Sequence, residues 1–315
     1  MVCTDESDEE QHLAVRRVLD HYLHTVQAAI KFLHPRMDSP IAVPRRPGVL
    51  QQEFNDPETA WAWLEVEYPV LVAAIRLAAD KGYNDYAWQL PSALEEYFDR
   101  RGHRYDCVAA HQAALAAAER GEDRYGQAYA HYGLGRVSHW LGRFEQAQTH
   151  LEHALTLFEG LNEKGHTAHA HIELGHILEH QGRVPDALSH ARRALSLARA
   201  TDNRRVQARA LHFVVWYYAL LGDYQKALAY SQRALALCRQ AGDRRIEGYV
   251  LSGIGYAYHG LGQYERAIEY FQQELASRSE LVDRYSQAVT FTFLGDSHHA
   301  AGNNNAACQA SDLRR

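Results

Sequence analysis

The stretch DRRIEGYVLSGIGYAYHGLGQYERAIEYFQQEL, residues 243–275, decides the fold because the chain repeats it. Apolar residues in its first half recur at three- and four-residue steps, the spacing of one helix face: Val250, Leu251, Ile254, Tyr258 and Leu261. Gly262 interrupts this face, and a second one follows: Tyr264, Ala267, Ile268, Phe271 and Leu275. Small residues at Gly255 and Ala267 indicate a close helix crossing. A single hairpin cannot bury its own apolar face, so we expect similar neighbours.

The turn glycine returns every forty residues: Gly102, Gly142, Gly182, Gly222, Gly262 and Gly302. A Leu-Gly or Ile-Gly pair returns in the first helix at 134–135, 174–175, 254–255 and 294–295. An alanine of the second helix returns in the same phase at Ala147, Ala187, Ala227, Ala267 and Ala307. A fixed period of this length predicts a solenoid of helical hairpins.

The order Leu-Gly, aromatic, Ala, Ala resembles the tetratricopeptide repeat (TPR). The resemblance implies an all-α fold, a right-handed superhelix (α-solenoid) of tetratricopeptide-type helical hairpins. Each repeat here is longer than the usual 34 residues. We expect the extra length in the linkers around Asp123-Arg124, Asp243-Arg244 and Asp283-Arg284.

Composition favours a protein of the reducing cytoplasm. The net charge of −6 gives no basic field for nucleic acid. Cys3, Cys107, Cys238 and Cys308 are too scattered for a disulfide framework or a zinc knuckle. The acidic N-terminus argues against a secretory signal, and no apolar run is long enough for a bilayer. We therefore expect no membrane contact and no cofactor.

Charge runs, prolines and glycines indicate boundaries between six parts of the chain. They are a disordered acidic tail (1–11), a helix (12–34), a linker (35–54), degenerate helical repeats (55–122), the TPR array (123–302) and a truncated last repeat (303–315). Asn55 to Glu58 is a helix-start signature. The helix that follows is expected to break before Pro69, and a second one to run from Val70 to Lys81. Pro91 marks the next hairpin as atypical.

The last repeat departs from the pattern. Its second helix is expected to begin at Asn304, where earlier repeats have an aromatic residue. Because solenoids need a polar terminal unit, we expect Phe291 and Leu294 to be partly uncovered. Such a patch favours self-association through the C-terminal end.

Five segments resemble a class of actinobacterial regulators: RVLDHYLHT (17–25), AWLEVEYPVLVAAIRLAADKG (62–82), AWQL (87–90), YFDRRGH (97–103) and LGDSHHAAG (294–302). These are SARP-like and related NB-ARC (STAND) transcriptional regulators, in which a DNA-binding domain and a nucleotide switch precede a sensory TPR array. Residues 12–34 would then be the last helix of the switch. The sequence contains no GxxxxGK[ST] phosphate loop, so the ATPase is not expected here. The resemblance implies a non-enzymatic sensor arm.

In a TPR superhelix the first helix of each repeat lines a concave groove. Carried onto this chain, the groove positions are Tyr129, Tyr132, Arg136, His139, His169, His176, Glu179, Arg209, His212, Trp216, Tyr249, Ser252, Tyr256 and His259. Tyrosine, tryptophan and arginine are the residue types that dominate binding hot spots. We therefore expect a protein or peptide partner, or a small ligand, in this groove.

Two alternatives stay open. His176-Ile-Leu-Glu179-His180 matches the HxxEH pattern of inverted zinc peptidases, which would make the chain a metal-dependent hydrolase. The repeat explains the same segment by its register, so we expect no catalytic residue and no metal. Residues 12–47 carry six basic and two acidic residues, a net +4 that is weak for direct DNA binding.

Overall fold

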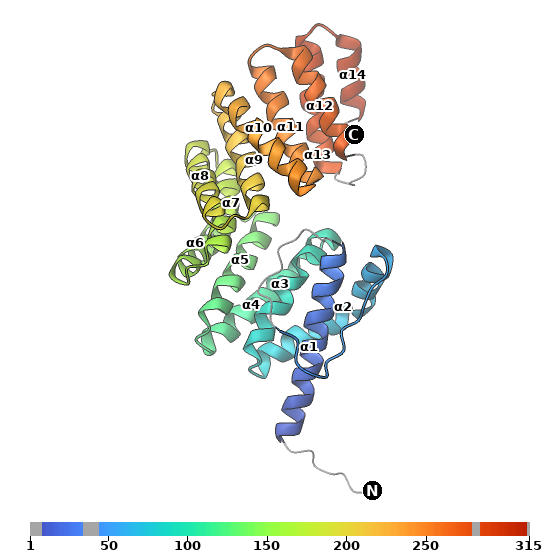
Figure 1. The fold of residues 1–315 in the computed structure, drawn as a ribbon, viewed down its shortest axis with the longest axis vertical. Helices are drawn as coiled ribbons and strands as arrows, with labels where there is room; N and C mark the ends of the chain where they lie inside the picture. Colours follow the sequence, from blue (N-terminus) through green and yellow to red (C-terminus); the bar gives the residue numbers. More distant parts are fainter. Residues whose placement is uncertain (1–7, 34–43, 279–283, 314–315) are drawn as a thin grey trace. The chain divides into compact units, whose positions relative to one another are not determined.

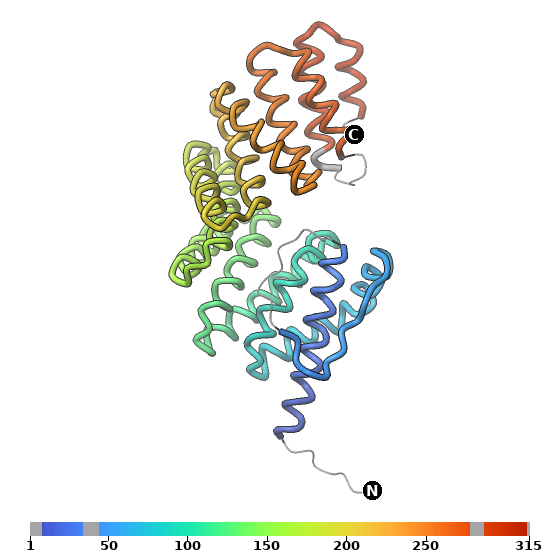
Figure 2. Tube along the Cα trace, in the orientation of Figure 1, coloured from blue at the N-terminus to red at the C-terminus, as the bar shows by residue number. Residues whose placement is uncertain are grey.

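The computed structural model describes residues 8–33, 44–278 and 284–313. Within these ranges it contains fourteen α-helices and no strand. The chain divides into two compact units, Met1–Asn162 (the N-terminal unit) and Glu163–Arg315 (the C-terminal unit). Each unit is built from antiparallel helices, as the ribbon and the Cα trace show (Figures 1 and 2), and short turns join most of them; residues 34–56 separate the first two.

The helices follow one another with a constant period. Those of the N-terminal unit are α1 (Asp8–Leu33), α2 (Pro57–Asp80), α3 (Asn84–Arg101), α4 (Arg104–Arg120), α5 (Arg124–Trp140) and α6 (Phe144–Gly160). Those of the C-terminal unit are α7 (Lys164–His180), α8 (Val184–Ala200), α9 (Arg204–Leu220), α10 (Tyr224–Ala241), α11 (Arg244–Gly260), α12 (Tyr264–Arg278), α13 (Arg284–Ala300) and α14 (Asn304–Leu313). From α4 onward each helix begins twenty residues after the last. The predicted all-α fold of TPR-type hairpins is confirmed.

From α5 to α11 the extra length of the repeats lies in the helices and not in the linkers, so the prediction is wrong there; Asp283 lies outside the described residues. The helices α5 to α9 each have 17 residues, and three-residue turns join them. Asp123 and Asp243 cap helices, since their side chains accept the backbone N–H groups of Gly126 and Ile246. An aspartate at this position stabilises the next helix and leaves no room for a linker.

Turns between hairpins have the same left-handed backbone as the turns within them. The residue with positive φ inside each hairpin is glycine, as at Gly142 and Gly262. Between hairpins it is Glu122 (φ 53°), Asn162 (φ 56°), Asp202 (φ 50°) or a glycine, as at Gly242 (φ 60°). The repeating glycine in the sequence revealed the turns within hairpins. It did not reveal the turns between hairpins, because most of those positions are not glycine.

The predicted close crossing at Gly255 is confirmed. A Cβ atom on Gly255 would lie 2.7–2.9 Å from ring carbons of Phe271 in α12. Gly135 has the same role in the hairpin of α5 and α6, where a Cβ would lie 2.5 Å from Leu151 Cγ. Phe271 and Leu151 are both fully buried. Glycine in the first helix thus makes room for a large apolar residue in the second.

The N-terminal region differs from the expectation at two points. Helix α1 begins at Asp8, so residues 8–11 are helical; residues 1–7 lie outside the described ranges. Helix α2 runs unbroken through Pro69, with Asp56 as its cap. Leu64, Leu71 and Ile75 are buried on one side of α2, and this continuous apolar face offsets the backbone hydrogen bond that Pro69 removes. The predicted linker is described from residue 44 onward and contains no helix before Pro57.

At the other end α14 begins at Asn304, as predicted. Leu294 is buried against Phe271 and Ala310, so the expectation that it is left uncovered is wrong; Phe291 is half-buried. Self-association through this end stays a prediction. Among the described helices, none has the length and apolar character needed to cross a membrane. Cys107, Cys238 and Cys308 are free thiols, and Cys3 lies outside the described residues.

Candidate functional site

The predicted groove residues lie at four repeated positions on α5, α7, α9 and α11. Thirteen of the fourteen are half-buried, as side chains on the rim of a helix face should be. Tyr129 is the exception: it is buried, stacked on Trp88 at a ring distance of 4.6 Å and set edge-on to Phe158. The ten half-buried positions of the C-terminal unit are called the C-terminal stripe below: His169, His176, Glu179, Arg209, His212, Trp216, Tyr249, Ser252, Tyr256 and His259.

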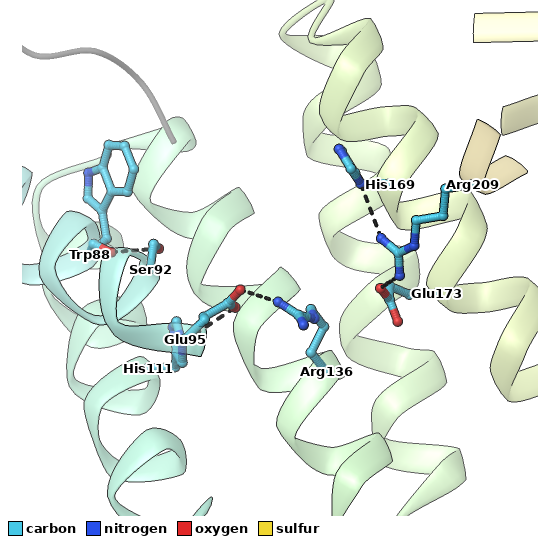
Figure 3. A network of polar contacts seen from close by, with 8 residues as sticks. All are labelled: Trp88, Ser92, Glu95, His111, Arg136, His169, Glu173 and Arg209. Carbon is cyan, nitrogen blue, oxygen red and sulfur yellow. Dashed lines mark hydrogen bonds and ion pairs between the residues drawn. The ribbon is translucent and has the colours of Figure 1, made fainter. Parts of the chain in front are cut away.

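Arg209 at one end of the C-terminal stripe is held by a buried carboxylate. Its Nη2 donates to Glu173 Oε1 at 2.6 Å, and its Nη1 lies 3.4 Å from His169 Nδ1 (Figure 3). Glu173 is 5% exposed, so its charge needs this partner. Sequence reasoning missed Glu173. The available signal was an acidic residue inside the apolar run AHIELG, where the equivalent positions are Gly133, Phe213 and Gly253.

Trp216 in the middle of the stripe is bonded to Glu179 of α7. Its Nε1 donates to Glu179 Oε1 at 2.6 Å. Tyr217 of α9 is fully buried near Glu179: burial first, and then the charge of Glu179, raise the pKa of its hydroxyl. Burial raises the pKa of Glu179, and the bond from Trp216 opposes that shift. Glu179 therefore fixes the indole ring of Trp216 in place.

The HxxEH residues are arranged for this packing role. The rings of His176 and His180 lie 5.1 Å apart, one turn apart on α7. Glu179 lies between them in sequence and accepts a hydrogen bond from Trp216 of α9, which is not the arrangement of a general base beside a metal-bound water. His176 also contacts the ring of Phe213 at 5.6 Å.

Aromatic rings continue the stripe across α9, α11 and α13. Trp216 meets Tyr256 edge-on at 5.3 Å, and Tyr256 meets Phe293 edge-on at 5.3 Å. His212 stacks on Tyr249 at 5.2 Å. Phe293 was not among the predicted residues, because no equivalent aromatic occurs in the neighbouring repeat. These rings, with Arg209 and the histidines, can contact apolar, aromatic and carboxylate groups of a partner.

His259 at the far end of the stripe is tied to α13. Its Nδ1 lies 2.9 Å from the hydroxyl oxygen of Ser297, and its ring meets Tyr264 edge-on at 5.4 Å. Ser252 is half-buried on the same helix. The stripe is therefore a continuous, internally braced wall within the C-terminal unit.

In the N-terminal unit Arg136 is used inside the protein. Its guanidinium forms an ion pair with Glu95 (Figure 3). It also lies over the rings of Trp140 (5.0 Å) and Tyr132 (5.8 Å). His111 is fully buried, with Nε2 3.9 Å from Glu95 Oε1. Burial, and then the charge of Arg136, lower the pKa of His111 to about 3. His111 is therefore a neutral neighbour of the Glu95–Arg136 pair.

His139, the last predicted residue of this unit, is half-buried with its ring 6.0 Å from that of Phe144. It lies one helical turn beyond Arg136 on α5. Of the predicted groove residues, the N-terminal unit therefore has fewer half-buried side chains than the C-terminal stripe has.

A protein-family model described as tetratricopeptide repeat matches residues 126–200 and 166–240 of the chain. A second family model with the same description matches residues 250–285. Residues 126–240 and 250–285 contain tetratricopeptide repeats. No curated protein matches the chain.

Solved TPR-like structures resemble the chain at low sequence identity. Aspartyl phosphate phosphatase F from Bacillus subtilis is 14% identical with a TM-score of 0.64, over 98% of this chain and 74% of that one. The apo form of RapI is 16% identical with a TM-score of 0.57, over 72% and 96%. A Rap protein complexed with competence and sporulation factor is 16% identical with a TM-score of 0.55, over 79% and 75%. At these identities the likeness shows the fold alone.

Proposed function

We propose that the chain is a non-enzymatic TPR module that binds a protein or peptide partner on the C-terminal stripe. The observation that carries the proposal is the cluster of Trp216 and Tyr256, half-buried in ring contact on α9 and α11. Both residue types dominate the energy of protein interfaces. Trp216 is also held rigid by Glu179, which lowers the entropy lost when a partner binds.

A binding role agrees with one of the similar structures. The Rap protein named above was solved in complex with competence and sporulation factor, so at least one protein of this fold holds another molecule. The sequence resemblance to SARP-like and NB-ARC regulators supports a further step. We propose that the partner or ligand controls transcription through a regulator of which this array is the sensory arm. The net charge of −6 supports a partner other than nucleic acid.

The proposal is tested with a displayed library of random peptides selected on the full chain. Selected peptides are then measured against Trp216→Ala/Tyr256→Ala. If the two rings are hot spots, the double variant should bind at least thirtyfold more weakly, a loss of about 2 kcal/mol. Trp216→Phe keeps an aromatic ring and removes the N–H group that Glu179 accepts. It should therefore lose less affinity than the alanine variant.

Tyr230→Ala is the matched control. Tyr230 is a half-buried tyrosine on α10, stacked on Tyr218, and it lies outside the stripe. Its removal should leave peptide affinity within about twofold. Circular dichroism should show unchanged helicity for all variants. Peptides that bind Trp216→Ala/Tyr256→Ala as tightly as the unmodified chain would show that the stripe is not the binding surface.

A further inference from the structure

Two neighbouring hairpins contain the same pair of histidines in contact. His131 of α5 and His150 of α6 have their Nδ1 atoms 3.0 Å apart. His171 of α7 and His190 of α8, forty residues later, also have Nδ1 atoms 3.0 Å apart. Since an imidazole Nδ1 is either a donor or an acceptor, each contact needs one proton shared between two rings. At both pairs a metal cation could therefore take the place of the proton that the two rings share.

The hairpins differ at the residue one turn after the second histidine. In the hairpin of α5 and α6 it is His153, an exposed residue whose ring lies 4.9 Å from the ring of His131. In the hairpin of α7 and α8 the equivalent residue is Arg193, also exposed. Burial first, and then the charges of His190 and Arg193, lower the pKa of His171 to about 4. One pair thus faces a third potential ligand, and the other faces a fixed positive charge.

We propose that His131, His150 and His153 form a binding site for a divalent transition-metal ion, with Zn²⁺ as the probe, and that Arg193 prevents the equivalent pair from binding one. Imidazole nitrogen is a preferred zinc ligand at 2.0–2.1 Å, so two nitrogens 3.0 Å apart can both reach one ion once the rings turn toward it. Water would complete the coordination, because three protein ligands leave a fourth position open.

A second histidine pair has to be controlled in any test. His176 and His180 lie one turn apart on α7 with ring centroids 5.1 Å apart, a spacing that also binds metals. His180 is exposed, so His180→Ala removes this pair with little effect on packing. The zinc measurements are best made on the full chain that carries this background substitution.

The experiment is calorimetric titration with Zn²⁺ at pH 7.5 in a buffer that does not coordinate metals. In the His180→Ala background the chain should bind zinc, and His153→Arg, which copies Arg193, should weaken that binding at least tenfold. Arg193→His, which copies His153, should add one further equivalent of bound zinc. Both substituted positions are exposed, so the fold should be unaffected and circular dichroism should not change.

The outcomes decide between this site and others. Zinc affinity unchanged by His153→Arg would overturn the proposed site, because the metal would then be bound elsewhere. Loss of zinc binding in the His180→Ala background itself would assign the metal to His176 and His180 and equally overturn the proposal. A failure of Arg193→His to add a second equivalent would overturn the role given to Arg193.

Discussion

The two helices of a hairpin cross at the same repeat positions in α3–α4 and in α11–α12, but side chains of opposite polarity fill the two crossings. Where α11 crosses α12, Gly255 leaves room for the buried ring of Phe271. At the equivalent positions in α3 and α4, 160 residues earlier in a forty-residue period, stand Glu95 and His111. These two side chains are also buried. One crossing is filled by a hydrocarbon ring, and the other by a carboxylate and an imidazole.

The difference shows what each solution requires from its neighbours. Gly255 and Phe271 complement each other within one hairpin. Glu95 needs a counter-charge, which Arg136 of α5 in the next hairpin supplies. Gly133 of α5 makes space for the His111 ring, because a Cβ atom there would overlap it. The polar crossing therefore depends on a charged side chain from the next hairpin, whereas the apolar crossing is complementary within its own hairpin.

The largest expected effect comes from removing the counter-charge. Arg136→Met leaves Glu95 buried without its ion pair, and breaking a buried pair in this way costs about 3–5 kcal/mol. Arg136 is partly exposed, so we expect a loss near the lower end of that range. Urea unfolding followed by tryptophan fluorescence measures it, since four of the five tryptophans lie in the N-terminal unit. Trp216→Phe as a background removes the fifth.

The control converts the polar crossing into the apolar one. Glu95→Gly with His111→Leu copies Gly135 and Leu151 of the next repeat. In this background Arg136→Met should cost less than about 1 kcal/mol, because no buried carboxylate is left unpaired. An equal cost of Arg136→Met in both backgrounds would mean that Arg136 acts through its contacts with Trp140 and Tyr132 instead.

The second effect depends on pH. Native His111 has a pKa of about 3 against an ordinary value of 6.5, so below pH 6.5 the unfolded chain binds a proton that the native chain does not. Stability is therefore full above pH 6.5 and falls as the pH drops toward 3, by up to about 1.4 kcal/mol per pH unit. His131 and His171, whose pKa values are lowered to about 4, act in the same direction.

The same converted variant isolates the contribution of His111. Between pH 6.5 and pH 5 the unmodified chain should lose about 1.6 kcal/mol more than the variant with Glu95→Gly and His111→Leu. Urea unfolding at the two pH values measures the difference. Parallel losses in the two proteins would show that His111 takes up its proton in the native state and that its pKa is not lowered.

The fold could be predicted from the sequence because the residues that define the repeat determine the backbone and the packing at their own positions. Gly142 and Gly262 occupy turns that need positive φ, and Gly255 occupies a crossing that needs a small side chain. The turn at Asp202 and the unbroken α2 at Pro69 were missed. In both places packing of the flanking helices overrides the local preference of the residue, and this packing is not visible in single-residue propensities.

The structure shows where the predicted groove residues lie and which side chains hold them, and their role in binding stays a prediction. The period located Trp216 and Tyr256 on one face, and the structure gives both half-buried. The partners that hold the stripe, such as Glu173, lie at positions where neighbouring repeats have glycine or phenylalanine. A residue that departs from the repeat pattern indicates that the local packing differs at that position. It does not show that the partner of Glu173 is a side chain 36 residues away on another helix.

The smallest effect tests the apolar crossing. Gly255→Ala places a methyl group 2.7–2.9 Å from ring carbons of Phe271, which is fully buried and cannot swing away without disturbing the core. Adding a methyl group to a filled core costs about 1–2 kcal/mol here, even though alanine favours the helix over glycine by up to about 1 kcal/mol. Gly165→Ala on α7 is the matched control, because no atom lies within 4 Å of its Cβ position. It should leave stability unchanged or raise it slightly, by helix propensity alone. Hydrogen exchange of the amides in α11 and α12 measures the first change and that of α7 the second, without assuming that the whole chain unfolds in one step. Equal, small effects of the two substitutions would mean that the crossing of α11 and α12 can open to admit a side chain, so that the glycine of the repeat would not be required for close packing there.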